Sequence, residues 1–154
     1  PLDVVLVDVL EAVPLEHQSE NYLIDPSKYW QRIGTCELSD VFEVHSPEVQ
    51  PYLYGNLSPF VNGTEIEQIG YSLTLIKVSS FTINQTTNMD GKPKTKASFI
   101  YNGKWYSNMA VTDPSYYSVP NGTKFANAYL VVSLPATPFP GDCYYKFLAQ
   151  IFPQ

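Results

Sequence analysis

The dipeptide Asn102-Gly103 constrains the fold more than any other feature of the chain. Both residues accept positive φ, so the pair favours the two-residue turn that joins antiparallel strands. The runs on either side, residues 94–101 and 104–112, are rich in β-branched and aromatic residues. The sequence therefore predicts a β-hairpin at this position.

Three further strands are predicted on the same grounds, at residues 71–83, 125–134 and 144–152. A long strand and a hairpin, followed after an insertion by two more strands, match the grouping of an OB barrel. The insertion carries no helix signal, so a loop is expected to close that end. We predict a mainly β fold in which residues 68–154 form a five-stranded OB-like barrel. Other small barrels or sandwiches with five or more strands remain open.

The N-terminal half of the chain carries weaker signals. Residues 4–9 form a β-branched run and predict a strand. Asp25 and Pro26 suit the start of a helix and Gly34 suits its end, so a short helix is predicted between them. One more helical turn is expected at residues 38–44, within an otherwise irregular connector.

Charge divides the chain into two parts. The net charge of −6 would argue against a nucleic-acid partner. However, residues 1–67 hold 12 acidic and two basic side chains, a net of −10, whereas residues 68–154 hold three acidic side chains and seven lysines, a net of +4. Of the 22 aromatic residues, 15 also follow residue 67. Basic and aromatic side chains together suit phosphate contact and base stacking, although lysines on aromatic-rich strands can equally be solvated surface.

No metal, cofactor or catalytic site is expected. Cys36 and Cys143 would need both histidines to complete a four-ligand zinc site, and the sequence has no closely spaced ligand pair. His17 with nearby carboxylates, or Cys36 with His45, would be the only acid-base or thiol-imidazole pairs, and neither lies in a recognised catalytic motif. We therefore predict that the protein is not an enzyme, and that the polar block at residues 17–25 has a structural role.

The apolar stretches are too short for a membrane helix and no leader peptide opens the chain, so we expect a cytoplasmic protein with no membrane partner. An exported glycoprotein is an alternative class. It would require a Cys36–Cys143 disulfide and glycans at the Asn-X-Ser/Thr sites.

The chain resembles the dual OB-containing domain family of prokaryotes. Its most specific matching piece is the block at residues 17–25 followed by Tyr29-Trp30. Weaker pieces are residues 2–5, 75–78, 99–103, 111–114, 129–134 and 141–144. The resemblance implies OB folds and nucleic-acid binding, and it supplies no catalytic residues. Members look as if they carry an additional N-terminal segment, so residues 1–67 are expected to form the end of a first, incomplete OB-like barrel plus a helical connector.

The binding hypothesis centres on the predicted hairpin. Lys92, Lys94 and Lys96 alternate and would project from one face of a strand, while Lys104, Trp105 and Tyr106 would return across the turn. The candidate nucleic-acid-binding residues are Lys92, Lys94, Lys96, Tyr101, Lys104, Trp105, Tyr106, Tyr116 and Tyr117. These lysines would equally protect an exposed edge from aggregation, and Trp105 would equally suit a core.

The leading prediction is a non-catalytic module that binds single-stranded or structured nucleic acid through the C-terminal barrel. The alternative is a protein-interaction or sensor module that uses the same barrel face, which the overall negative charge favours. The strand at residues 4–9 also leaves open a homodimer formed by strand exchange.

Overall fold

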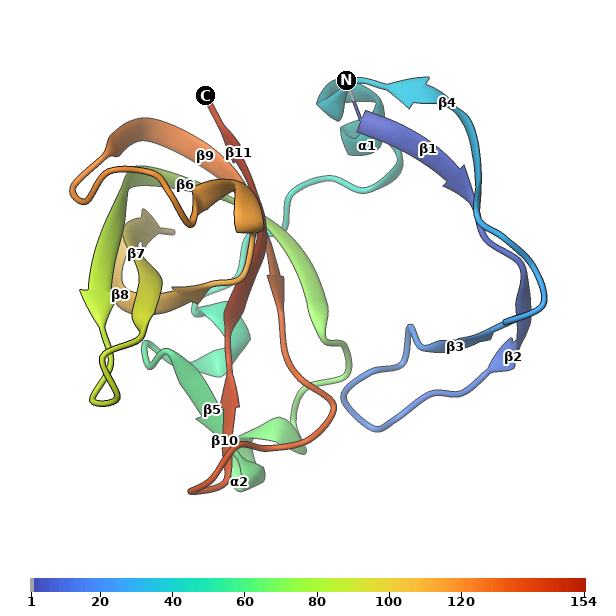
Figure 1. Cartoon of the computed structure of the whole chain (residues 1–154). Helices are drawn as coiled ribbons and strands as arrows, with labels where there is room; N and C mark the ends of the chain where they lie inside the picture. Colours follow the sequence, from blue (N-terminus) through green and yellow to red (C-terminus); the bar gives the residue numbers. More distant parts are fainter. Residues whose placement is uncertain (1) are drawn as a thin grey trace.

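A closed β-barrel forms the C-terminal half of the computed structural model, which describes residues 2–154 (Figure 1). Around the barrel the order of strands is β11 (Phe147–Pro153), β8 (Lys104–Val111), β7 (Pro93–Tyr101), β6 (Leu73–Thr87) and β9 (Lys124–Ser133). Neighbours pair antiparallel, apart from β8 and β11, which run parallel. The prediction of a mainly β fold with an OB-like barrel is confirmed.

Strand β6 closes the barrel because it bends. Its register with β7 shifts between Ser79 and Thr82, and Ser80 between them has a φ of 52°. Such a bulge increases the local bend and twist of a strand. As a result, residues 73–82 pair with β9 while residues 79–87 pair with β7.

The predicted hairpin is also present. Asn102 and Gly103 have φ values of 46° and 73° and connect β7 to β8, as a turn with two positive-φ residues requires. The last predicted strand differs, because the chain forms two strands on either side of Lys146. The first of them, β10 (Cys143–Tyr145), leaves the barrel to pair with β5 (Phe60–Asn62).

The core of the barrel is aromatic and aliphatic. The rings of Phe81 and Phe99 stack with centroids 6.3 Å apart, and Phe99 stacks on Tyr106 at 5.5 Å. The connector contributes to the same core, since Leu53, Tyr54 and Val61 are buried in it. Leu53 and Tyr54 belong to the short 3-10 helix η1 (Leu53–Gly55), and α2 (Gly63–Ile66) follows β5.

A ribbon of paired strands extends from the barrel (Figure 1). It comprises residues 2–36, in which β1 (Leu2–Leu6) pairs with β4 (Gln31–Cys36) and β2 (Val9–Ala12) pairs with β3 (Tyr22–Ile24). The helix α1 (Leu38–Val44) follows, as predicted for residues 38–44. Among the helices of residues 2–154, none has the length and apolarity that a membrane crossing requires.

The helix predicted from Asp25 to Gly34 is wrong. Asp25 Oδ1 accepts hydrogen bonds from Ser27 N at 2.9 Å and Ser27 Oγ at 2.7 Å, so the capping side chain forms a turn instead. Gly34 pairs with Val4 within β4. Strand pairing over about thirty residues therefore overrides the local helix signals.

Candidate functional site

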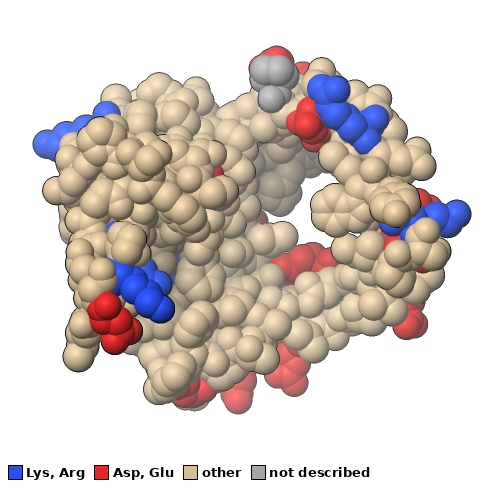
Figure 2. Space-filling view, in the orientation of Figure 1, with Lys and Arg blue, Asp and Glu red and all other residues tan. Residues whose placement is uncertain are grey.

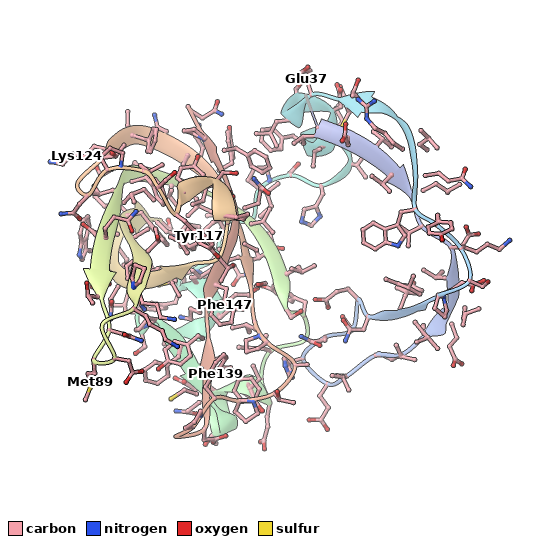
Figure 3. The ribbon with its side chains drawn as sticks, in the orientation of Figure 1. Glu37, Met89, Tyr117, Lys124, Phe139 and Phe147 are labelled. Atoms are coloured by element: carbon pink, nitrogen blue, oxygen red, sulfur yellow. The ribbon has the colours of Figure 1, made fainter. Side chains whose placement is uncertain are left out.

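A groove of about 710 Å³ lies on the outer face of the barrel, over β7, β8 and the ends of three loops. Its lining includes Lys94 and Lys96 from β7 and Tyr117 from the loop after β8. It also includes Phe139 from the loop after β9, Tyr145 from β10 and Phe147 from the start of β11. Figure 3 shows Tyr117, Phe147 and Phe139 following one another down one face of the barrel. A concave surface with aromatic and cationic walls can bind a planar, anionic ligand.

The cationic wall results from the alternation of side chains along β7. Ala97 and Phe99 point into the barrel and are buried, whereas Lys94 and Lys96 line the groove. Partial burial, and then repulsion from Lys94, lowers the pKa of Lys96. Two ammonium groups that repel each other provide a favourable position for a phosphate.

The aromatic wall consists of Phe139, Tyr145 and Phe147. Phe139 meets Tyr145 edge to face at 5.5 Å between centroids and Phe147 at 5.9 Å. The backbone fixes Phe139, since its N–H donates to Cys143 O at 2.8 Å and its carbonyl accepts from Cys143 N at 3.3 Å. Phe139 remains 46% exposed, so its ring is available to a ligand.

The loop that carries Tyr117 is held by two polar side chains. Asp113, which is 1% exposed, accepts hydrogen bonds at 3.0 Å from Ser115 N and Ile151 N. Gln85 Nε2 donates to Val119 O at 2.8 Å. The hydroxyl of Tyr117 donates to Thr112 O at 3.1 Å. The loop that carries Tyr117, which forms the third wall of the groove, is therefore fixed to β6 through Gln85 and to β11 through Ile151.

The whole chain can now be compared with known families. The dual OB-containing domain family matches residues 1–151. The chain belongs to this family. Neither the comparison with curated proteins nor that with solved structures gives a match. As a dual OB-containing domain, the chain has one closed barrel within the described residues 2–154, and the groove lies on it.

The structure brings together three of the sequence-predicted residues of this dual OB-containing domain. Lys94, Lys96 and Tyr117 all line the groove. Lys92 lies in the preceding turn, where its N–H donates to Asn88 Oδ1 at 2.8 Å, and its side chain is not part of the groove lining. In Figure 2 basic side chains lie in separate groups on the barrel and on the ribbon, so the positive charge is not one continuous patch.

Three predicted residues have a different place. Tyr101, Tyr106 and Tyr116 are buried in the core, which corrects the interpretation that their rings face a ligand. The odd-numbered positions of β7 face inward, and a bulge at Asn108, with φ 60°, shifts the register of β8. The hydroxyls of Tyr101 and Tyr106 instead accept hydrogen bonds from the connector, from Gln50 N at 2.7 Å and Leu53 N at 2.9 Å.

Two others lie near the far end of the hairpin. Lys104 places its Nζ 4.7 Å from the ring centroid of Tyr52. Trp105 is 55% exposed, so it is not a core residue, and it does not line the groove. Lys104 and Trp105 directly follow the turn at Asn102-Gly103, which lies at the opposite end of β7 from Lys94. They are therefore separated from the groove.

Sequence reasoning missed the aromatic wall. The sequence predicts a strand at residues 144–152, and nothing in the spacing of residues 139–147 indicates that three rings line one groove with β7. The available signal was the aromatic cluster Tyr144-Tyr145 and Phe147 beside a Gly-Asp turn. A turn between the fourth and fifth strands of an OB barrel is a frequent ligand contact.

The polar side chains of the block at residues 17–25 form hydrogen bonds with the backbone at one end of the barrel. His17 Nε2 lies 3.0 Å from Pro135 O, Gln18 Nε2 donates to Leu134 O at 3.1 Å, and Glu20 accepts from Ser72 N at 2.9 Å. Cys36 and Cys143 are free thiols, so they form no disulfide. Residues 2–154 contain no group of three potential metal-ligating side chains.

Proposed function

We propose that this dual OB-containing domain is a non-catalytic module that binds single-stranded nucleic acid in the groove over β7 and β8. The observation that carries the proposal is that Lys94 and Lys96 line one groove together with Phe139, Tyr145 and Phe147. The lysines would contact phosphates and the rings would stack on bases. Stacking contributes about 1–3 kcal/mol per base.

Shape supports a single strand over a duplex. The groove is bounded by the loops that carry Tyr117 and Phe139, and its volume of about 710 Å³ suits a few splayed nucleotides better than a rigid double helix. The acidic N-terminal half, with its net charge of −10 over residues 1–67, would also repel a longer duplex.

The test is fluorescence-anisotropy binding of labelled single-stranded DNA, single-stranded RNA and duplex at low and high salt. The groove variant is Lys94→Ala with Lys96→Ala. Its matched control is Lys92→Ala with Lys104→Ala, which removes the same charge outside the groove lining. For single strands we expect the groove variant to bind more weakly and to lose roughly 1.4 from the slope of log K against log salt, because two phosphate contacts disappear.

Equal losses in the two variants would show that binding follows net charge and not this groove. Absence of binding to all three probes, with the protein folded, would favour the protein-interaction alternative. A peptide in the same groove would lack the steep salt dependence of phosphate contacts.

A further inference from the structure

A second pocket, here called the connector pocket, lies where the connector meets the residues that precede β6. Its volume is about 330 Å³, within the range of pockets that hold small ligands. Tyr54 and Tyr71 supply rings to its lining, Gln50 and Gln68 supply amides, and Glu65 supplies a carboxylate. The connector pocket shares no lining residue with the groove over β7 and β8, so the two sites are separate.

The two rings of the connector pocket are held rigidly. Tyr54 has a φ of 49° and a ψ of 43°, a left-handed conformation that a residue other than glycine keeps only where its surroundings fix it. Its hydroxyl donates to Ser72 O at 2.7 Å, and its ring meets that of Tyr71 with 5.8 Å between centroids. The pair therefore forms a fixed aromatic wall.

Two carboxylates lie at the connector pocket, one in its lining and one bonded to lining residues. Glu48 Oε2 accepts from Gln50 Nε2 at 2.7 Å and from the hydroxyl of Tyr71 at 3.2 Å. Glu65 Oε2 accepts from Asn62 N at 2.9 Å in the capping box of α2. A carboxylate can accept about four hydrogen bonds, so Glu65 is held in place and keeps acceptor capacity for a ligand.

The charge around the connector pocket is negative. Residues 33–76 hold six acidic side chains and no lysine or arginine, and acidic side chains gather along the lower edge of the molecule in Figure 2, where Figure 1 places α2. Burial, and then the neighbouring Tyr71, raises the pKa of Tyr54, and the carboxylates of Glu48 and Glu20 raise it further. These negative charges act on the wall of the pocket, so they would attract a cation.

Glu20 adds an acceptor that lacks a donor. It lies at the tip of the hairpin between β2 and β3, where its Oε1 accepts from Ser72 N at 2.9 Å. Its other oxygen, Oε2, is buried and has no hydrogen-bond partner within residues 2–154. A buried carboxylate oxygen of this kind is stabilised by a nearby positive charge.

The buried ammonium group of Lys146 is bound elsewhere. It interacts with the charge of Glu65, but it donates to the carbonyl oxygens of Leu53 and Asn56 at 2.7 and 3.0 Å and is outside the pocket lining. Among the described residues the lining includes no lysine, arginine or histidine, so the charge of the lining is that of Glu65.

We propose that the connector pocket binds a small aliphatic amine as its ammonium ion, with the N–H groups donating to the Glu65 carboxylate and the alkyl chain against Tyr54 and Tyr71. A tyrosine ring face attracts a cation, and the amide oxygens of the lining are further acceptors. The described residues contain no group of three potential metal-ligating side chains, and such a spread of carboxylates suits an organic cation better than a metal ion.

The test is a titration of the full chain followed by ¹H–¹⁵N nuclear magnetic resonance at constant ionic strength. The probe is n-butylammonium, and 1-butanol is the neutral probe of similar shape. The backbone amides of Gly55 and Gly70 report on the pocket, because both residues line it. An N-acetyl-lysine methylamide arm separates the two sources of this chemistry, a free amine and the lysine side chain of a partner.

The pocket variant is Glu65→Gln, which removes the charge but retains a side chain that can complete the capping box. The matched control is Glu67→Gln, since Glu67 is the next acidic residue of the chain, is exposed and is outside the lining. Tyr71→Leu is a second variant, which removes a ring and keeps both carboxylates. The dispersion of each spectrum verifies that the variant is folded.

We expect n-butylammonium to shift the Gly55 and Gly70 amides saturably, and 1-butanol to leave them unshifted at the same concentrations. The dissociation constant should rise about tenfold or more in Glu65→Gln and also rise in Tyr71→Leu. In Glu67→Gln it should change less than about twofold, because an exposed charge outside the pocket is screened. Lys94→Ala with Lys96→Ala should bind the amine as the wild type does, since the groove is a separate site.

Three results would overturn the proposal: no saturable shift with n-butylammonium, equal binding of 1-butanol, or equal weakening by Glu65→Gln and Glu67→Gln. Saturable binding in which the lysine derivative is the tighter ligand would support the pocket as a site for a partner's lysine side chain. The reverse order would support it as a site for a free amine.

Discussion

Lys146 Nζ donates a 2.7 Å hydrogen bond to Asn56 Oδ1, across ninety residues of sequence. The same ammonium group donates to Leu53 O at 2.7 Å and to Asn56 O at 3.0 Å, and the side chain is fully buried. Burial lowers the pKa of Lys146 to about 7, and the carboxylate of Glu65 opposes this shift. A buried lysine fastened to three oxygen atoms is a structural tie between the connector and the strands β10 and β11.

The first prediction concerns this tie. Replacing Lys146 with Met keeps the apolar stem but leaves the three oxygens without their donor. We expect the free energy of unfolding, measured by urea denaturation, to fall by about 2–4 kcal/mol. Because Tyr145 and Phe147 flank Lys146 and line the groove, ligand binding should weaken in the same variant.

Lys124→Met is the control, because Lys124 is exposed at the start of β9. Its free energy of unfolding should stay within about 0.5 kcal/mol of the wild type. A Lys146→Met variant as stable as this control would show that the three oxygens find other donors.

The position of Lys146 also shows where sequence reasoning reaches its limit. Local patterns predicted the barrel strands, because alternation along β6 and β7 and the positive-φ pair Asn102-Gly103 are properties of neighbouring residues. The helix signals at Asp25 and Gly34 misled because the partner strand, β1, lies about thirty residues away. A lysine in an apolar strand predicts solvent exposure, and only the distant Asn56 explains its burial.

In the candidate site too, residues placed by a local pattern could be predicted, whereas residues placed by distant contacts could not. Lys94 and Lys96 could be assigned to one face because the period of a strand is two residues. Phe139 could not, since a loop brings it to the groove through its bridge to Cys143. The inward direction of Tyr101 and Tyr106 depends on barrel closure, which no single strand specifies.

The second prediction concerns the aromatic wall. Phe139→Ala removes an exposed ring that meets Tyr145 and Phe147 and, by our proposal, stacks on a base. Binding of single-stranded oligonucleotides should weaken by about 1–3 kcal/mol in anisotropy titrations, with little effect on stability. Trp105→Ala is the matched control, since it removes a similarly exposed ring away from the groove. Equal weakening by both changes would argue against a specific aromatic wall.

The third prediction is a pH dependence of binding. Burial, together with Lys94, lowers the pKa of Lys96, so this side chain loses its charge at a lower pH than an ordinary lysine. Since phosphate contact needs the charged form, affinity for single strands should decline as pH rises through this lowered pKa. Lys96→Arg keeps its charge, because arginine titrates only above about pH 12, and its affinity should hold over the same range.

Lys92→Arg serves as the control for this titration, since Lys92 is outside the groove lining. It should lose affinity with rising pH as the wild type does. If the affinity of Lys96→Arg falls with rising pH in parallel with the wild type and Lys92→Arg, a group other than Lys96 governs the pH dependence.

The last prediction concerns the fastening of the ribbon. The ring of His17 is buried, lies 3.0 Å from Pro135 O through Nε2, and meets Tyr144 edge to face at 5.2 Å between centroids. His17→Ala removes both contacts, so amides of β2 and β3 should exchange with solvent faster while those of β6 to β9 keep their protection. The matched control is His45→Ala, whose ring is exposed, lies 3.9 Å from Glu48 and makes no contact with the hairpin tip that His17 fastens. Unchanged exchange in β2 and β3 would mean that Gln18 and Glu20 hold the hairpin tip without His17, and faster exchange throughout β6 to β9 would mean that the ribbon also stabilises the barrel.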